Sequence, residues 1–302
     1  CLPADKIIWD VGHQSYTHKI LTGRQEGFDS LRTLGGMSGF PKRSESPCDA
    51  YDTGHSSTSI SAGVGYVCAR DLKGEDYHVI SVIGDGALTG GMAYEAINNA
   101  SALKKNFIIV LNDNEMSISE NVGGISSYLS NMRTTEGYFE LKAGVKNSLN
   151  KIPGLGPAAI KQIHKTKDSL KRLMIPGMFF EDMGLTYLGP INGHDCNRMI
   201  QVFQEAKRVS GPVLVHVKTE KGRGYEPAMR HPARFHGTAA FDLEHGIPLN
   251  NNGKANYTDI FSTVMRKFGD REEKVVAVTA AMPDGTGLKR FRNMFPDRFF
   301  DV

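Results

Sequence analysis

Two short polar triplets carry the side chains of this chain that are best suited to hold a divalent cation. They are Gly84-Asp85-Gly86 and, after 25 intervening residues, Asn112-Asp113-Asn114. Each triplet closes a run rich in β-branched residues, 78–83 and 107–111, and a stretch with helical periodicity separates them. The pattern predicts a strand–loop–helix–strand unit that ends its strands in a carboxylate and in carboxamides. Such oxygens suit Mg²⁺, which fills its remaining positions with phosphate and water oxygens.

The residues around the first triplet also suit a diphosphate. Gly86 has no Cβ, so phosphate oxygens could approach its backbone. A helix that starts near Thr89 would direct its N–H groups toward the same place. The segment 53–58 precedes a helix predicted over 57–70, and its hydroxyl side chains favour capping of that helix over phosphate binding. Either triplet alone could be only a turn, whereas the two together favour a metal–diphosphate site.

Further polar side chains follow the other predicted strands. Ligands of open α/β sheets bind at the carboxyl ends of the strands. His13 follows the first predicted strand, and Lys221 and Tyr225 follow the strand at 212–218. His13 and His18 are five residues apart, whereas a helical zinc pair prefers a spacing of four with a nearby Glu. We therefore interpret His13 as a hydrogen-bonding residue of a ligand site and His18 as a packed or solvent-facing side chain.

Composition excludes several classes of protein. The chain has 302 residues, 40% of them hydrophobic and 23% charged, which predicts a globular protein of about two domains. A net charge of +3 without a concentrated basic face argues against a nucleic-acid partner. No apolar run reaches the roughly 18 residues of a membrane span. Four cysteines without a C-x-x-C pair indicate free thiols and a reducing, cytoplasmic location.

The order of the predicted elements indicates the fold class. Strands are predicted at 6–11, 77–83, 107–111, 185–188, 212–218 and 275–279, and helices at 57–70, 92–103, 195–209 and 258–268. Alternating strands and helices predict an α/β fold with a mostly parallel sheet and helices on both of its faces. We expect a diphosphate- and Mg-binding domain at 1–240, a linker at 241–256 and the start of a second similar domain at 257–302. A Ser-, Asn- and Gly-rich mobile excursion is expected at about 117–180.

The two triplets together resemble the thiamine-diphosphate fingerprint. Further segments narrow the resemblance to the transketolase-like 1-deoxy-D-xylulose-5-phosphate synthase family, namely 10–24, 53–63, 112–121, 189–195 and 221–227. The resemblance covers essentially the whole chain and implies the thiamine-diphosphate-binding fold.

The resemblance also implies a reaction. Pyruvate would be decarboxylated on thiamine diphosphate, and the two-carbon unit would add to D-glyceraldehyde 3-phosphate to give 1-deoxy-D-xylulose 5-phosphate and CO2. This transferase step would be the first of the non-mevalonate isoprenoid pathway and would also supply thiamine and pyridoxal synthesis. The full-length enzyme would be a homodimer with thiamine diphosphate and Mg²⁺ as cofactors.

Matching motifs imply roles for individual residues. The Mg²⁺ ligands would be Asp85, Asn114 and the backbone carbonyl of Met116. The residues that contact the cofactor would be His13, Gly54, His55, Ser56, Gly86, Ala87, Asn114 and Tyr225. The catalytic residues would be His13, Lys221 and His236. A cationic Lys221 suits the pyruvate carboxylate, and His236 suits proton transfer.

The chain departs from the family in its extent. In this family the Glu that activates the aminopyrimidine ring lies beyond Val302, and Asp284 comes too early to replace it. We therefore expect the 302-residue chain itself to be inactive. Two alternatives remain open from the residues: another thiamine enzyme, such as a transketolase or a 2-oxoacid dehydrogenase subunit, or a non-catalytic module that holds a nucleotide-like diphosphate through Mg²⁺. A metal hydrolase built on His13 and His18 is disfavoured by their spacing.

Overall fold

The computed structural model of the chain describes residues 2–114, 128–129, 178–238, 240–249 and 255–302. The chain divides into two compact units, Cys1–Asp113 with Tyr128–Thr219, and Asn114–Ser127 with Glu220–Val302. Nearly all of the predicted excursion lies outside the described residues. The predicted domain limits at 240 and 256 stay predictions.

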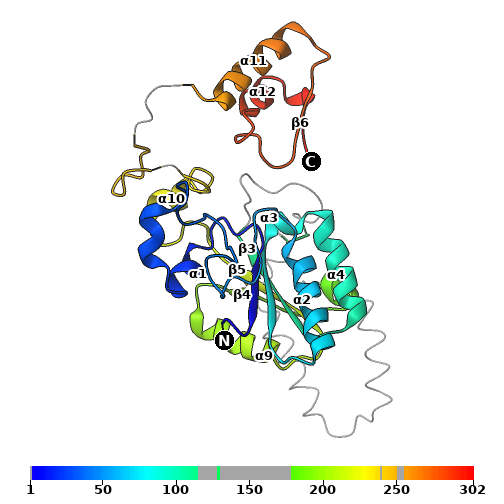
Figure 1. The fold of residues 1–302 in the computed structure, drawn as a ribbon. Coiled ribbons are helices and arrows are strands. Elements are labelled where there is room, and N and C mark those ends of the chain that lie inside the picture. The colour runs from blue at the N-terminus through cyan, green and yellow to red at the C-terminus, as the bar shows by residue number, and fades with distance from the viewer. Residues whose placement is uncertain (1, 115–127, 130–177, 239, 250–254) are drawn as a thin grey trace. The chain divides into compact units, whose positions relative to one another are not determined.

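The first unit is built on a five-stranded sheet in the order β1-β2-β3-β5-β4, in which all neighbouring strands are parallel (Figure 1). The strands are β1 (Lys6–Trp9), β2 (Val79–Gly84), β3 (Phe107–Asp113), β4 (Thr186–Asn192) and β5 (Pro212–Lys218). The predicted parallel sheet is confirmed, and β5 coincides with the predicted strand at 212–218. Because the strands are parallel, their carboxyl ends lie at one edge of the sheet.

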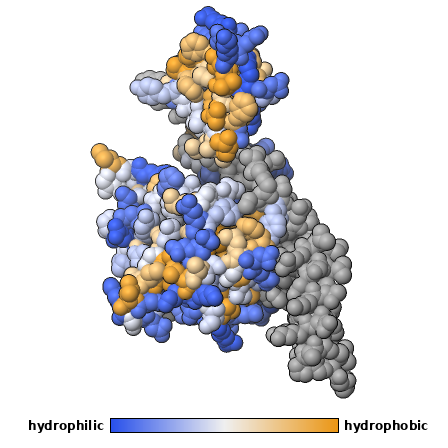
Figure 2. All heavy atoms as spheres, turned by 90° about the vertical axis from the view of Figure 1, so that its right-hand side faces the viewer, coloured by the Kyte–Doolittle hydropathy of each residue, from blue (hydrophilic) through white to orange (hydrophobic). Residues whose placement is uncertain are grey.

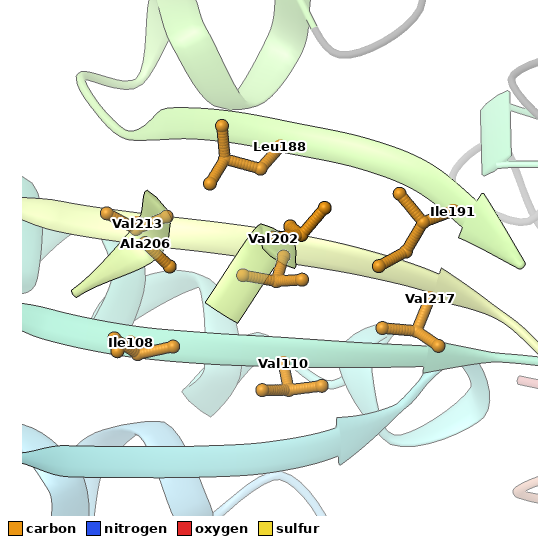
Figure 3. Packing of buried hydrophobic residues seen from close by; sticks show 9 residues of the cluster. Ile108, Val110, Leu188, Ile191, Val202, Ala206, Val213 and Val217 are labelled. Atoms are coloured by element: carbon orange, nitrogen blue, oxygen red, sulfur yellow. The ribbon is translucent and has the colours of Figure 1, made fainter. Parts of the chain in front are cut away.

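Helices pack on both faces of this sheet, as predicted. The helices of the first unit are α1 (Tyr16–Leu21), the 3₁₀ helix η1 (Gln25–Ser30), α2 (Ser59–Lys73), α3 (Asp85–Leu88), α4 (Gly91–Leu103), α8 (Met178–Asp182) and α9 (Cys196–Ala206). Figure 1 shows α2 and α4 side by side, and α2 packs on β1, β2 and β3. Figure 3 shows the opposite face, where Val202 and Ala206 of α9 pack over valines of β5. Alternate residues of each strand therefore pack against the helices on the two faces of the sheet.

Local sequence signals explain where α9 begins. Asp195 is its N-cap, and the Asp195 carboxylate accepts a hydrogen bond of 3.0 Å from the backbone N–H of Arg198. The buried residues Val202 and Ala206 are four apart, so they lie on one helix face. The predicted cap and apolar face are both confirmed.

A helix begins near Thr89, as predicted, since α4 starts at Gly91, but a short helix that was not predicted precedes it. The short helix α3 begins at Asp85, immediately after the extended Gly84, and Thr89 is its C-cap. The Thr89 hydroxyl donates to the Gly86 carbonyl at 2.7 Å and closes this turn. The next helix, α4, begins at Gly91 and ends at Leu103, which agrees with the helix predicted over 92–103.

The described residues of the second unit include another αβ arrangement. Its elements are α10 (Glu226–Arg230), α11 (Tyr257–Arg271), β6 (Ala277–Thr279), α12 (Lys289–Met294), the 3₁₀ helix η2 (Pro296–Arg298) and β7 (Phe299–Asp301). A capping box between Asn256 and Asp259 starts α11. Strands β6 and β7 pair in parallel, and the helix and strand predicted in this region are confirmed. Figure 2 shows apolar side chains on the surface of this part. Phe261 and Phe268 of α11 are exposed.

Two expectations from composition can be compared with the described residues. None of the helices in this part of the chain is both long and apolar enough to cross a lipid bilayer. Cys48, Cys68 and Cys196 are free thiols, as predicted, whereas Cys1 lies outside the described residues.

Candidate functional site

The register between β2 and β3 brings the two triplets to the same edge of the sheet. Gly84 lies opposite Asn112 in the parallel pairing, so the residues that follow each strand leave the sheet side by side. Asp85, the first residue of α3, is only 1% exposed. Carboxylate oxygens are ligands that Mg²⁺ prefers, and the place of Asp85 at the end of β2 makes it a candidate ligand for such a cation.

The first two residues of the second triplet are anchored to β5 and its extension. The Thr219 hydroxyl donates to Asn112 Oδ1 at 2.8 Å, and the Thr219 N–H donates to the Asp113 carbonyl at 2.9 Å. The Asp113 carboxylate accepts a hydrogen bond of 2.8 Å from His216 Nε2. Asn112 and Asp113 therefore fix the end of β3, and Asn114 is the next residue along the chain.

A tight backbone turn after β1 brings His13 beside the 53–58 segment. Val11 and Gly12 have φ values of 54° and 80°, in the left-handed region. A Cβ on Gly12 would lie 2.6 Å from Pro41 Cδ and would also clash with the Thr53 hydroxyl, so only glycine fits this approach. The residue before His13 therefore lies against Thr53, at the start of the 53–58 segment.

The N-terminus of α2 is capped by Asp10, which sequence reasoning missed. The Asp10 carboxylate accepts hydrogen bonds from the N–H groups of Ser57 at 2.7 Å and Ser59 at 2.9 Å. The formal N-cap, Thr58, makes no side-chain capping bond, so the expectation that hydroxyls of the 53–58 segment cap α2 is wrong. Asp10 lies at the carboxyl end of β1, and the strand-end rule used for His13 could have identified it.

The same contacts tie this segment to the first triplet. Ser57 has a φ of 66°, and its hydroxyl donates to the Ala87 carbonyl at 2.7 Å. Gly54, His55 and Ser56 are exposed beside this anchor, and His55 Nδ1 bonds the Ser56 carbonyl at 2.7 Å. Within the first unit, the structure therefore brings His13, the 53–58 segment and Ala87 into one connected region.

A buried cluster of charged side chains joins α1, which follows His13, to the segment 45–49. His18 Nε2 bonds Asp49 at 2.8 Å, Arg24 bonds the same carboxylate at 2.7 Å, and the fully buried Lys19 bonds Glu45 at 2.6 Å. Burial acts to raise the pKa of Asp49, but the hydrogen bonds from His18 and Arg24 outweigh it and hold that pKa well below its ordinary value. His18 is therefore a packed side chain, as predicted.

The predicted site residues Lys221, Tyr225 and His236 belong to the second unit, which also begins with Asn114. Lys221 Nζ lies 2.8 Å from His236 Nδ1, so the two predicted catalytic residues meet. The Tyr225 hydroxyl donates to the Leu243 carbonyl at 2.8 Å, and its ring packs edge-on against Phe235, with centroids 5.6 Å apart. Met116 lies outside the described residues.

The predicted linker contributes to the packing around Tyr225. Phe241 and Pro248 form an isolated antiparallel bridge, which folds residues 241–249 into a turn. The Phe241 ring lies 6.0 Å from that of Tyr225 and 5.2 Å from that of Phe235. This part of the chain is therefore not an extended connection.

A family model and curated proteins match this chain. The family model described as 1-deoxy-D-xylulose-5-phosphate synthase matches residues 1–219. Curated synthases of that name from Lachnoclostridium phytofermentans and Desulfitobacterium hafniense are each 56% identical over 300 residues, which cover 99% of this chain and 48% of theirs. The chain thus spans about half the length of the curated relatives it matches.

A solved structure supports the fold. A transketolase from Campylobacter jejuni matches with a TM-score of 0.50 and 18% identity, over 94% of this chain and 50% of that one. At this identity the likeness shows the fold alone. The family match and the identity to the curated synthases go further, and the chain belongs to the 1-deoxy-D-xylulose-5-phosphate synthase family.

Proposed function

We propose that the chain forms the diphosphate- and Mg²⁺-binding part of a 1-deoxy-D-xylulose-5-phosphate synthase. This transferase would join a two-carbon unit from pyruvate to D-glyceraldehyde 3-phosphate with release of CO2, act as a homodimer and feed isoprenoid, thiamine and pyridoxal synthesis. Beyond family membership, one structural observation carries the proposal. The pairing of Gly84 with Asn112 sets a buried carboxylate and the end of the Asn-Asp-Asn triplet at one edge of the sheet.

The residues at this edge fit a Mg²⁺-bound diphosphate. Thr53 Oγ1 is buried, and no described residue offers it a hydrogen-bond partner, so it could bond a ligand. A Cβ on Gly54 would meet no atom within 4 Å, which leaves its backbone open to a ligand. Asp85 and Asn114, with the carbonyl of Met116, would hold the ion. Gly86 and Ala87 would lie against the diphosphate.

The remaining residues would bind and orient the substrate and cofactor. Thiamine diphosphate, when bound, would supply the electron sink for decarboxylation. His13 would hydrogen-bond the cofactor or substrate, since the turn at Gly12 holds it beside the 53–58 segment. Gly54, His55 and Ser56 would contact the cofactor. Because the Tyr225 hydroxyl is bonded to Leu243, Tyr225 would contribute its ring.

The contact between Lys221 and His236 assigns the proton on the imidazole. An ammonium group only donates, so Nδ1 of His236 accepts and the neutral ring carries its proton on Nε2. The Lys221 charge would attract the carboxylate of pyruvate. The Nε2 proton of His236 would be available for transfer to a reacting oxygen.

Calorimetry with the 302-residue chain tests this function. We expect thiamine diphosphate to bind in the presence of Mg²⁺ and to lose affinity when the ion is chelated. Asp85→Asn removes the charge but keeps the shape, and it should weaken Mg²⁺-dependent binding by about 10-fold or more. Product formation is not expected, because the chain spans about half the length of its relatives.

The matched control is Asp76→Asn, the same substitution at an exposed position before the amino end of β2. It should leave binding unchanged. Equal affinity with and without Mg²⁺, or binding unaffected by Asp85→Asn, would contradict the proposal. Tighter binding of ADP than of thiamine diphosphate would instead support the nucleotide-binding module.

A further inference from the structure

Three buried polar side chains form a hydrogen-bonded chain across neighbouring strands beneath the second triplet. Tyr187 of β4 bonds His216 Nδ1 at 2.7 Å, and His216 Nε2 of β5 bonds Asp113 of β3 at 2.8 Å. Each of the three residues is at most 1% exposed. Because β5 lies between β3 and β4, these hydrogen bonds link three adjacent strands (Figure 1).

The chemistry of the three groups fixes the direction of these bonds. An ionised Asp113 carboxylate only accepts, so His216 donates to it from Nε2. The neutral imidazole then accepts at Nδ1, and the Tyr187 hydroxyl donates there. One tautomer of His216 therefore satisfies both contacts of its ring, and a buried network satisfied in this way rigidifies its surroundings.

Packing holds Tyr187, at one end of these hydrogen bonds, in place. The Tyr187 ring stacks on the ring of the buried Phe180, with centroids 6.1 Å apart and planes at 1°. A Cβ on Gly189 would lie 2.6 Å from the carbonyl oxygen of His216, so β4 approaches β5 closely at this point. Neither Tyr187 nor His216 has room to shift without disturbing the sheet.

The position of the acceptor suggests what this network does. On the same face, the neighbours Ile109 and Leu214 are buried and apolar, so the core does not require polar groups there. The polar chain ends on the middle residue of Asn112-Asp113-Asn114. It therefore acts on the segment from which the proposed metal ligand Asn114 continues.

We propose that His216 and Tyr187 are positioning residues that fix the end of β3 so that Asn114 can bind Mg²⁺. This inference rests on the proposed function. His216 would act through the Asp113 carboxylate, which joins β5 to the residue before the ligand. Loss of a hydrogen-bonding residue that helps to position a metal ligand lowers the metal affinity about 10- to 100-fold.

A pair of substitutions at one position separates this role from simple destabilisation. The side-chain nitrogen of Gln reaches the place of Nε2 and can donate to Asp113, whereas that of Asn reaches only the place of Nδ1. We expect His216→Asn to weaken Mg²⁺-dependent binding of thiamine diphosphate about 10- to 100-fold. His216→Gln should restore most of that affinity, although both variants unfold at lower denaturant concentration. Tyr187→Phe should give a smaller loss of affinity.

The control variant is Asn106→Ala, at the opposite end of the same two strands. Asn106 precedes β3, and its Oδ1 accepts a hydrogen bond of 2.9 Å from the N–H of Gly211, just before β5. Its loss should lower stability but leave the affinity for Mg²⁺ and thiamine diphosphate unchanged. The positioning role is refuted if all four variants lose affinity in proportion to their loss of stability. It is also refuted if none of them loses affinity while the wild type binds. In both cases the proposed function stands.

Amide hydrogen exchange measures the positioning without any ligand. The N–H of Thr219 bonds the Asp113 carbonyl at one end of the β3–β5 pair, and that of Gly211 bonds Asn106 at the other. His216→Asn should speed exchange at Thr219 and not at Gly211, whereas Asn106→Ala should do the reverse. If the wild type binds no cofactor, the proposed function fails. Unchanged exchange at Thr219 overturns the positioning role in either case.

Discussion

The carboxylate of Asp10 accepts a hydrogen bond of 2.7 Å from the backbone N–H of Ser57, 47 residues further along the chain. Through the Ser57 hydroxyl, the connection continues to the Ala87 carbonyl. The end of β1, the start of α2 and the short helix α3 are therefore joined at the carboxyl edge of the sheet. The exposed residues 54–56 leave directly from this junction.

Replacement of Asp10 should lower both stability and cofactor binding. Asp10→Ala removes the acceptor for two N–H groups, which should reduce the free energy of unfolding by about 1–2 kcal/mol. The same change frees the segment that carries Gly54 and His55, so Mg²⁺-dependent binding of thiamine diphosphate should weaken. Urea unfolding and calorimetry measure the two effects. Asp195→Ala removes the cap of α9 and should cost similar stability without a change in binding.

Two glycines beside the candidate site should respond differently to a methyl group. Gly12 has φ 80°, and its Cβ would clash with Pro41, so Gly12→Ala should reduce the free energy of unfolding by about 2 kcal/mol or more. A Cβ on Gly54 would meet nothing within 4 Å, so Gly54→Ala should leave stability nearly unchanged. If Gly54 contacts the cofactor, Gly54→Ala should weaken binding in calorimetry. A fully stable Gly12→Ala protein would contradict the tight turn after β1.

Asp49 should make the protein sensitive to acid. Its folded-state pKa is lowered, so its stabilisation is complete above the unfolded pKa of about 3.9 and is lost as the pH falls toward the folded pKa. Asp49→Asn should flatten this part of a plot of unfolding free energy against pH. At neutral pH it should cost about 3 kcal/mol, because Arg24 loses its partner at 2.7 Å and keeps only the Glu45 carboxylate at 3.5 Å. The exposed Asp52 provides the control, and Asp52→Asn should leave the acid slope nearly intact.

Tyr94 should make the protein less stable at alkaline pH. Burial raises the pKa of Tyr94 to about 12, and no described residue bonds its hydroxyl. Ionisation of this hydroxyl leaves the free energy of unfolding unchanged below the unfolded pKa of about 10. The free energy of unfolding then falls as the pH rises through about 12, because the unfolded state ionises first. Tyr94→Phe should therefore flatten the alkaline limb and raise the free energy of unfolding at neutral pH by about 1 kcal/mol. Tyr187→Phe, which removes a bonded hydroxyl, should lower it.

The local elements near the site could be predicted from the sequence because their signals are local. The β-branched run 212–218 ends in polar residues and coincides with β5. Asp195 lies three residues before the N–H that it caps, so its role in α9 is readable from adjacent residues. The helix α3 could not be predicted, because its four residues are too few to show helical periodicity.

The sequence by itself determined the strands, their polar ends and the two triplets, since hydrophobic periodicity and turn residues act over a few positions. Only the tertiary structure decided which polar groups meet. His216 reaches Asp113 over 103 residues because β5 is inserted between β3 and β4, an order that differs from the order along the chain. Asp10 reaches Ser57 because α2 packs back on β1. Hydrogen bonds of this kind depend on strand order and helix packing, which no local pattern encodes.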